Sequence, residues 1–411
     1  MIRRTAFTGA LAGTLAAVLV LALPTSAALA APPPCRNTES FAAWLGKFKA
    51  EAAAQGISRA AIAAASPYLV YDQRIINIDR GQKFFAQDFL TFSRKVLPTY
   101  RLVRGRKLIK KYDDLFARAE KEYGVPAPVI VAFWGLESDF GANMGKDRAI
   151  RSLATLAYDC RRGEKFRGHL FDALRMIERG DLDASQMIGS WAGEMGQTQM
   201  MPSEYLKHAV DYDGNGHRNL LRSVPDVIGS TANYLASMGW RRGEPWLQEV
   251  DIPNNLAWDQ ADLAIQHPRS QWAQWGVKLR GGKPLPADNL SASLLLPMGR
   301  NGPAFLAYPN FQAYLKWNNS LVYSTAAAYY ATRLAGAPAM DKGARNIPTL
   351  SVAQARELQQ LLARRGFDVG EIDGKIGAAT RAAVKQAQLK LGMPADSYAT
   401  PELIGRLRTM R

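Results

Sequence analysis

The sequence has almost no cysteine and no long apolar run beyond its first 30 residues. A transmembrane helix needs about 20 consecutive apolar residues, so the mature protein is expected to have no transmembrane span and to be soluble. The only cysteines are Cys35 and Cys160. In an oxidising compartment a disulfide between them is the simplest use of the pair, and two unpaired thiols are the alternative.

Acidic residues are also in deficit, with 36 Asp and Glu against 52 Lys and Arg. Residues 1–4 (Met-Ile-Arg-Arg) begin a basic segment, residues 11–23 are apolar, and residues 28–30 (Ala-Leu-Ala) offer a small-residue cleavage site. This pattern predicts a secretory signal peptide over residues 1–30, cleaved near Ala30. Its removal takes away Arg3 and Arg4 and leaves a net charge of +14. For an exported protein, this charge favours an anionic polymer or a membrane surface as partner. Nucleic acid is the usual alternative for such a charge, and export argues against it.

What the sequence does contain is an uncharged run, residues 129–136, that ends in the single carboxylate Glu137. Pro126 and Pro128 suit the first turn of a helix, because that turn has no use for their missing N–H groups. Glu137 would then lie at the C-terminal end of a buried helix, where the helix dipole and the apolar surroundings disfavour a negative charge. A carboxyl group kept protonated near neutral pH suits general-acid chemistry on a sugar ether oxygen. The alternative is a helix-end Glu exposed to water.

Helical periodicity dominates the rest of the chain and predicts a mainly α protein with minor β structure. Helices are expected over residues 38–65 with a break near residue 55, and over residues 108–123, 166–177, 227–238 and 320–334. Short strands are expected near Val250, Val277 and Leu294. Pro and Gly residues indicate a linker over residues 337–348. We therefore expect a large domain over residues 36–336 and a compact helical domain over residues 349–411.

The last 63 residues carry motifs of their own. In order, they are a Leu-rich amphipathic helix over residues 352–366, Gly366-Phe367, Asp373-Gly374 with Gly377, and Thr380 with Ala383-Val384. This tail resembles the small three-helix peptidoglycan-binding domain found at the ends of many wall enzymes. One departure is Ala387-Gln388, where that family usually has Phe-Gln. Asp373, Gly374 and Gly377 suit turns, and contact with glycan is the alternative role for them.

A second segment, residues 190–203, combines Gly residues with neutral hydrogen-bonding groups that suit carbohydrate hydroxyl and acetamido groups. Together with Glu137-Ser138 and a later Asn-x-Ser-x-x-Tyr motif that starts at Asn318, it resembles the B-type lytic murein transglycosylase family. The resemblance covers residues 41–336, with three separated motifs in the right order. It implies a lysozyme-like helical catalytic domain that cleaves the glycan strands of peptidoglycan in the periplasm.

The resemblance also assigns roles to individual residues. Glu137 matches the sole catalytic acid/base. The residues expected to bind substrate are Ser138, Ser190, Gln199, Tyr234, Trp317, Asn318 and Tyr323. The family usually has Tyr at the position of Trp317, so stacking could persist there while a phenolic hydrogen bond is lost. For Tyr234 and Tyr323 the alternative is packing in the core of amphipathic helices.

A third segment, residues 211–217 (Asp-Tyr-Asp-Gly-Asn-Gly-His), has oxygen ligands at alternate positions, as in the first half of an EF-hand loop. Its twelfth position is Arg222, where an EF-hand has a bidentate Glu. In the resembled family a similar loop binds calcium and closes with a later Asp. A structural Ca²⁺ site is therefore expected at Asp211, Asp213, Asn215, the carbonyl of His217, and Asp226. The alternative is an Asp/Gly-rich turn without metal.

The resemblance implies a lytic transglycosylase that cleaves the β-1,4 bond between N-acetylmuramic acid and N-acetylglucosamine. Glu137 would act first as acid and then as base, and the 6-hydroxyl of the substrate would attack to give a 1,6-anhydro end without water or a cofactor. A hydrolytic muramidase is one alternative, with Asp139 or Glu194 as the second carboxylate. A non-catalytic protein that binds the wall through its tail is another. The partner in each case is peptidoglycan glycan, and the sequence is silent on protein partners.

Overall fold

The computed structural model describes residues 35, 37–81, 87–344 and 346–410. The signal peptide expected over residues 1–30 lies outside the described residues. Within them, no helix combines the length and the hydropathy needed to cross a bilayer. Residues from Asn37 onward form one compact unit.

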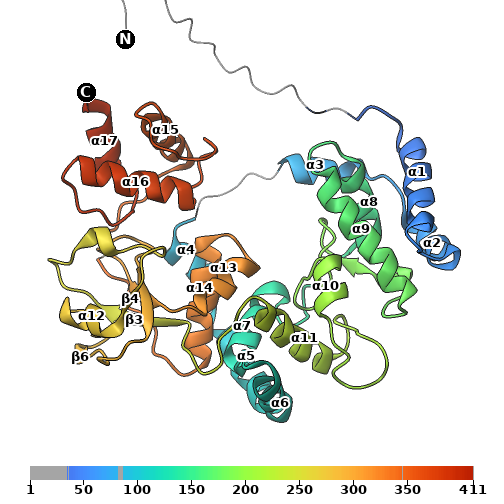
Figure 1. The fold of residues 1–411 in the computed structure, drawn as a ribbon, viewed down its shortest axis with the longest axis horizontal. Helices are drawn as coiled ribbons and strands as arrows, with labels where there is room; N and C mark the ends of the chain where they lie inside the picture. Colours follow the sequence, from blue (N-terminus) through green and yellow to red (C-terminus); the bar gives the residue numbers. More distant parts are fainter. Residues whose placement is uncertain (1–34, 36, 82–86, 345, 411) are drawn as a thin grey trace, which may run out of the picture. The chain divides into compact units, whose positions relative to one another are not determined.

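Helices dominate this unit, as the sequence predicted (Figure 1). The first seven are α1 (Phe41–Ala54), α2 (Arg59–Ala65), α3 (Gln73–Gly81), α4 (Phe89–Val96), α5 (Thr99–Lys111), α6 (Asp113–Tyr123) and α7 (Ala127–Ser138). They are followed by α8 (Ala149–Tyr158), α9 (Gly163–Glu178), α10 (Pro202–His208), α11 (Val224–Ser237), α12 (Arg269–Gln274), α13 (Phe311–Trp317) and α14 (Leu321–Leu334).

The uncharged helix α7 lies at the centre of the helical part. Every side chain from Val129 to Trp134 is buried. The helix packs against α5, α6, α11 and α14, so it is covered on several sides. This explains why it carries no charge before Glu137, since an unpaired charge in such a core is costly.

The minor β structure is an antiparallel sheet inserted between α11 and α13. Its strands are β3 (Leu247–Asp251), β4 (His267–Pro268), β5 (Lys278–Leu279), β6 (Lys283–Pro284), β7 (Ser291–Leu295) and β8 (Ala304–Ala307). They pair in the order β4-β7-β8-β3-β5-β6 and have their own apolar core around Trp272. A short two-stranded pair, β1 (Asp147–Arg148) with β2 (Ile188–Gly189), joins the segment after Glu137 to the segment before Ser190. The predicted mainly α fold with minor β is confirmed.

One predicted helix was wrong in extent. A single helix was predicted over residues 108–123, but α5 begins at Thr99 and ends at Lys111, and α6 begins at Asp113. Tyr112 separates them with φ −118° and ψ 31°, outside the helical region. Only one face of α5 packs on the core, so its apolar residues are few. The many basic residues between them hid the helical period in the sequence.

The C-terminal residues form α15 (Val352–Ala363), α16 (Ala378–Lys390) and α17 (Pro401–Thr409) around a separate apolar core. The connecting segment lies on the larger part of the unit, where the N–H of Asp341 donates to Glu249. Arg381 of α16 donates to the carbonyl of Leu296 at 3.1 Å. The three-helix tail therefore has its own core and also contacts the larger domain.

Candidate active site

Glu137 lies in the last turn of α7 and is half-buried. Its Oε1 accepts a hydrogen bond from Nε1 of Trp317 at 2.9 Å and another from the hydroxyl of Tyr323. Burial raises the pKa of Glu137 to about 7, while the hydrogen bonds from Tyr323 and Trp317 oppose the rise and the charge of Glu194 adds to it. A carboxyl group that titrates near neutrality can serve both as acid and as base.

The two donors lie about 180 residues after Glu137 in the chain. Trp317 is the last residue of α13, and Tyr323 lies in the first turn of α14. Ser320 caps α14 by accepting from the N–H of Tyr323, and Asn318 accepts from the N–H of Ser320 at 2.9 Å. Asn318 therefore fixes the turn that presents both donors to Glu137.

The aromatic side chains around Glu137 form a continuous row. The ring of Trp317 stacks on Phe133 of α7, with centroids 4.2 Å apart, and lies 5.2 Å from the ring of Tyr234. Tyr234 in turn lies 4.8 Å from His208. Trp317 is therefore stacked on an aromatic neighbour within the protein. The indole N–H also supplies a hydrogen bond in place of the phenolic one that the sequence analysis expected to be lost.

The turn after Glu137 is strained and is held by specific bonds. Asp139 and Phe140 both adopt the left-handed region, with φ of 52° and 59°. This conformation is costly for residues with a Cβ and marks a constrained segment. Asp139 is held there by the hydroxyl of Tyr100 at 3.1 Å and by Nε of Arg101 at 3.2 Å.

Ser138, which was expected to bind substrate, is buried. It is 1% exposed, and its hydroxyl donates to the carbonyl of Gln197 and accepts from the N–H of Gly141. These hydrogen bonds are made within the protein. Gln197 is a residue that the sequence analysis missed: its Oε1 also accepts from Nε1 of Trp134 at 2.8 Å. No local signal marks it, because its partners lie about 60 residues earlier.

The loop at residues 190–199 lies close to Glu137, since Glu194 acts on its pKa. The hydroxyl of Ser190 donates to Oε2 of Glu194 and accepts from the N–H of Ala192. The side-chain amide of Gln199 donates to the carbonyls of Met144 and Gly196 at 3.1 and 2.8 Å. Both residues are half-buried, and these hydrogen bonds shape the loop.

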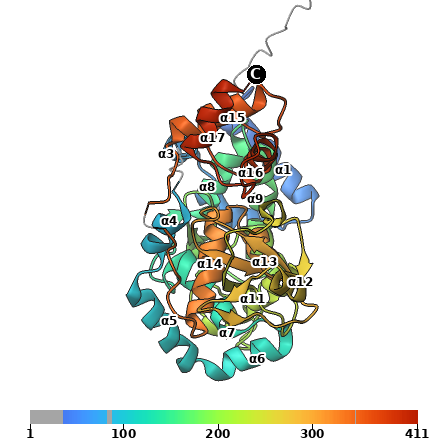
Figure 2. The same cartoon turned by 90° about the vertical axis from the view of Figure 1, so that its left-hand side faces the viewer.

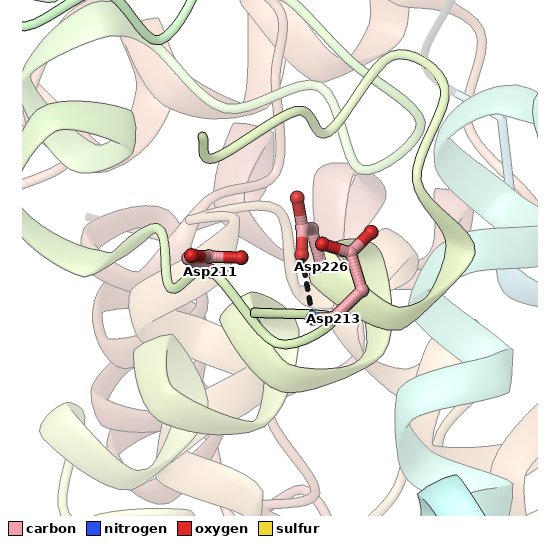
Figure 3. Close-up of side chains that lie close together, drawn as sticks. All are labelled: Asp211, Asp213 and Asp226. Atoms are coloured by element: carbon pink, nitrogen blue, oxygen red, sulfur yellow. Dashed lines mark hydrogen bonds between the residues drawn. The ribbon is translucent and has the colours of Figure 1, made fainter. Parts of the chain in front are cut away.

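Three of the expected calcium ligands lie together. Figure 3 shows Asp211, Asp213 and Asp226, whose ligand oxygens all lie within 4.8 Å of one another. Asp226 is buried, and burial raises its pKa. Its Oδ1 accepts from the N–H of Tyr212 at 2.8 Å and from the N–H of Asp213 at 3.4 Å, the latter drawn as the dashed line in Figure 3. Three carboxylates with oxygen-only donors form a set that suits a hard cation such as Ca²⁺.

The remaining residues of this loop already make hydrogen bonds within the protein. The side-chain oxygen of Asn215 accepts from the N–H of His217 at 2.9 Å, and Nδ1 of His217 contacts the carbonyl of Gly180. Asp211 accepts from three successive backbone N–H groups, which fixes the loop. Arg222 is exposed, and its backbone N–H donates to Oδ1 of Asn219.

Both cysteines, Cys35 and Cys160, are disulfide-bonded, and the described residues include no free thiol. The N–H of Cys160 donates to Oδ1 of Asn37 at 2.9 Å. Neither cysteine therefore offers a free thiol for chemistry.

Comparison with known proteins gives two family matches. A family model described as "Transglycosylase SLT domain" matches residues 40–332. A second, for a peptidoglycan binding domain, matches residues 351–407. Glu137 and the residues that surround it fall in the first match, and helices α15 to α17 fall in the second.

Individual relatives agree with these matches. The chain is 34% identical over 244 residues to membrane-bound lytic murein transglycosylase B of Escherichia coli (strain K12), covering 58% of this chain and 65% of that protein. The crystal structure of SltB3 from Pseudomonas aeruginosa in complex with NAG-anhNAM-pentapeptide has a TM-score of 0.84 and 41% identity, covering 90% of this chain and all of the other (100%). The structure of E. coli lytic transglycosylase Slt35 in complex with calcium has a TM-score of 0.55 and 31% identity, covering 64% and 83%. The alignment thus spans just under two thirds of the E. coli membrane-bound relative.

Proposed function

Because the chain belongs to the transglycosylase SLT domain family, we propose that it is a lytic murein transglycosylase that cleaves peptidoglycan glycan strands. The observation that carries the proposal is Glu137, a half-buried carboxyl group with a pKa raised to about 7 and two donors on one oxygen. The proposed bond is the β-1,4 linkage between N-acetylmuramic acid and N-acetylglucosamine.

In the first proposed step, Glu137 is the general acid. Its Oε1 already accepts from Trp317 and Tyr323, which leaves Oε2 to carry the proton. Transfer of this proton to the glycosidic oxygen releases the N-acetylglucosamine 4-hydroxyl and gives the muramoyl C1 oxocarbenium character. Trp317 and Tyr323 then stabilise the carboxylate that forms, because charge-assisted hydrogen bonds are stronger than neutral ones.

In the second proposed step, the same Glu137 carboxylate removes the proton from the 6-hydroxyl of the muramoyl sugar. That oxygen forms a bond to C1, which closes the 1,6-anhydro ring and returns the proton to Glu137. Atoms balance without water. The relative SltB3 was solved with NAG-anhNAM-pentapeptide, which supports an anhydro product here.

The contacts of the other two carboxylates bear on the hydrolytic alternative. Asp139 accepts hydrogen bonds from Tyr100 and Arg101, which compete with a bond to water. Glu194 accepts from Ser190 and lies close enough to influence the pKa of Glu137, so it is the stronger candidate for a second carboxylate. We favour the lytic reaction, because one carboxyl group with two donors suffices for it.

Two further parts belong to the proposal. Helices α15 to α17 would bind the cell wall in the periplasm while the larger domain cleaves glycan. Asp211, Asp213 and Asp226 would hold a structural Ca²⁺, as the calcium complex of the relative Slt35 supports. The acid/base scheme needs no metal, and the ion would stabilise the loop before α11.

Digestion of purified sacculi tests the reaction class. The soluble muropeptides would be separated and weighed, and 1,6-anhydro ends are expected. Hydrated reducing ends would instead support a muramidase, with Glu194→Gln as the diagnostic variant. An absence of soluble products would leave a protein that only binds the wall.

A further inference from the structure

Helix α5 carries a concentration of positive charge that the proposed reaction does not use. From Phe89 to Tyr112 the chain has eight Lys and Arg residues and no Asp or Glu. Only Arg101 of these eight forms an ion pair within the described residues, with Asp139. The positive charges therefore have little compensation inside this segment, although Asp88, Asp113 and Asp114 flank it.

The charges gather on one face of the helix. We call this the basic face of α5. Its residues are spaced three or four apart and are Tyr100, Val103, Arg104, Lys107, Lys110 and Lys111. All six are exposed, and they include two of the most exposed large apolar side chains of the described residues, Tyr100 at 53% and Val103 at 48%. Residues at this spacing lie side by side on a helix, so apolar and cationic groups are interleaved.

The opposite face of α5 is fixed to the core. Gly105 is buried so closely that an added Cβ would lie 2.8 Å from Leu334 of α14. The hydroxyl of Tyr330 donates to the carbonyl of Arg101 at 2.7 Å, and Arg106 donates to the carbonyl of Arg333 at 2.7 Å. The helix thus runs along the outside of the helical part (Figure 2). Because its backbone is fixed in this way, its basic face is preformed. A preformed face binds a partner without an ordering cost.

We infer that the basic face of α5 docks on the anionic headgroups of a lipid membrane surface. A basic amphipathic face with exposed aromatic and aliphatic side chains suits the headgroup region, where cations meet phosphates and the apolar groups enter the acyl boundary. An anionic wall polymer satisfies the lysines but gives Val103 no apolar surroundings. Docking here holds the enzyme at a membrane while its site works on glycan.

Vesicle sedimentation with the full chain tests the inference. The wild type is expected to bind phosphatidylglycerol vesicles and not phosphatidylcholine vesicles. Replacing Lys107, Lys110 and Lys111 together by Glu should lower binding to the anionic vesicles by about a hundredfold, since each cation near such a surface contributes roughly fivefold. Val103→Ser should lower it by a smaller factor at unchanged charge.

The matched control replaces Lys278, Lys283 and Lys342 by Glu, which makes the same change in net charge at exposed sites outside α5. It should bind anionic vesicles within about threefold of the wild type.

Equal losses in both triple variants, or no vesicle binding by the wild type, would overturn the inference. So would loss of sacculus retention by the α5 variant with vesicle binding unchanged, which would identify a wall polymer as the partner. Vesicles contain no glycan, and turnover of soluble glycan is measured separately, so failure here leaves the proposed reaction intact.

Discussion

The indole N–H of Trp317 donates to Oε1 of Glu137 at 2.9 Å, at a position where the resembled family usually has Tyr. The same oxygen accepts from Tyr323, so one side of the carboxyl group is saturated by aromatic donors. Because both donors stabilise the ionised form and burial opposes it, the pKa of Glu137 is set by a balance between them. Changes to any of the three side chains should be visible in the pH dependence.

The first prediction concerns Glu137 itself. Glu137→Gln keeps the size and both hydrogen bonds but removes the titrating proton, so turnover should fall by at least about a hundredfold and up to ten-thousandfold. Retention on sacculi and the melting temperature at acidic pH should stay near wild type. Near-normal turnover of sacculi would remove Glu137 from the mechanism.

The second prediction concerns the two donors. Trp317→Phe keeps an aromatic ring on Phe133 and removes the N–H, and Tyr323→Phe removes only the hydroxyl. Each loss should raise the pKa of Glu137, because each bond lowers it now. The alkaline limb of the kcat/KM profile, which reports loss of the acid form, should therefore move to higher pH in both variants. Turnover should fall by about tenfold, as expected for loss of a hydrogen bond to a charged group.

Two controls sharpen that test. Trp317→Tyr introduces the residue usual in the family and should restore part of the turnover relative to Trp317→Phe. A variant that merely loosened the fold would lower the melting temperature and leave the alkaline limb in place. An unshifted limb in both Phe variants would contradict a role for these donors in setting the pKa of Glu137.

The third prediction concerns stability against pH. The pKa of Glu137 is raised by burial from 4.5 to about 7 in the folded protein. A group with a raised folded pKa favours unfolding increasingly as pH rises from the unfolded value to the folded value, and the full cost persists above about 7. Allowing for partial exposure, this cost is about 2 kcal/mol.

Glu137→Gln removes this cost because Gln does not titrate. Its free energy of unfolding should equal that of the wild type near pH 4 and exceed it by about 2 kcal/mol near pH 8. Urea unfolding at both pH values measures the difference. A gap that does not grow with pH would mean that the carboxyl group is solvated in the folded state.

The positions of these residues show what sequence could and could not predict. A buried helix that ends near Glu137 could be predicted, because prolines, an uncharged run and a terminal carboxylate are local signals. The partners of Glu137 are not local, since Trp317 and Tyr323 lie about 180 residues away. Only the family motif pointed to them, and it gave them contact with substrate rather than with Glu137.

Ser138 illustrates another limit. It directly follows Glu137 in sequence and was expected at the substrate, but neighbouring residues on a helix point about 100° apart, and Ser138 is buried. The bonds of Asp139 to Tyr100 and Arg101 were equally invisible, because they depend on how α5 packs against α7.

The fourth prediction concerns the tail. Removal of residues 349–411 should weaken retention on intact sacculi and spare turnover of short soluble glycans, because α15 to α17 have their own core. Since Arg381 bonds the carbonyl of Leu296, a modest fall in melting temperature is expected as well. A truncated protein that is folded but inactive on soluble glycan would make the tail part of the catalytic unit.

The fifth prediction concerns calcium. Asp211, Asp213 and Asp226 supply three carboxylates within 4.8 Å of one another, which is a modest ligand charge, so binding should be weak, at roughly 0.1–1 mM. Millimolar Ca²⁺ should raise the melting temperature, because a ligand that binds only the folded protein stabilises it. Asp211→Ala with Asp213→Ala should abolish that rise, whereas Arg222→Ala, which removes an exposed cation nearby, should keep or increase it.

Activity on soluble glycan should respond to calcium only through stability, since no step at Glu137 uses the ion. If the melting temperature is the same with calcium and with chelator, the loop is an Asp/Gly turn held by its own backbone bonds.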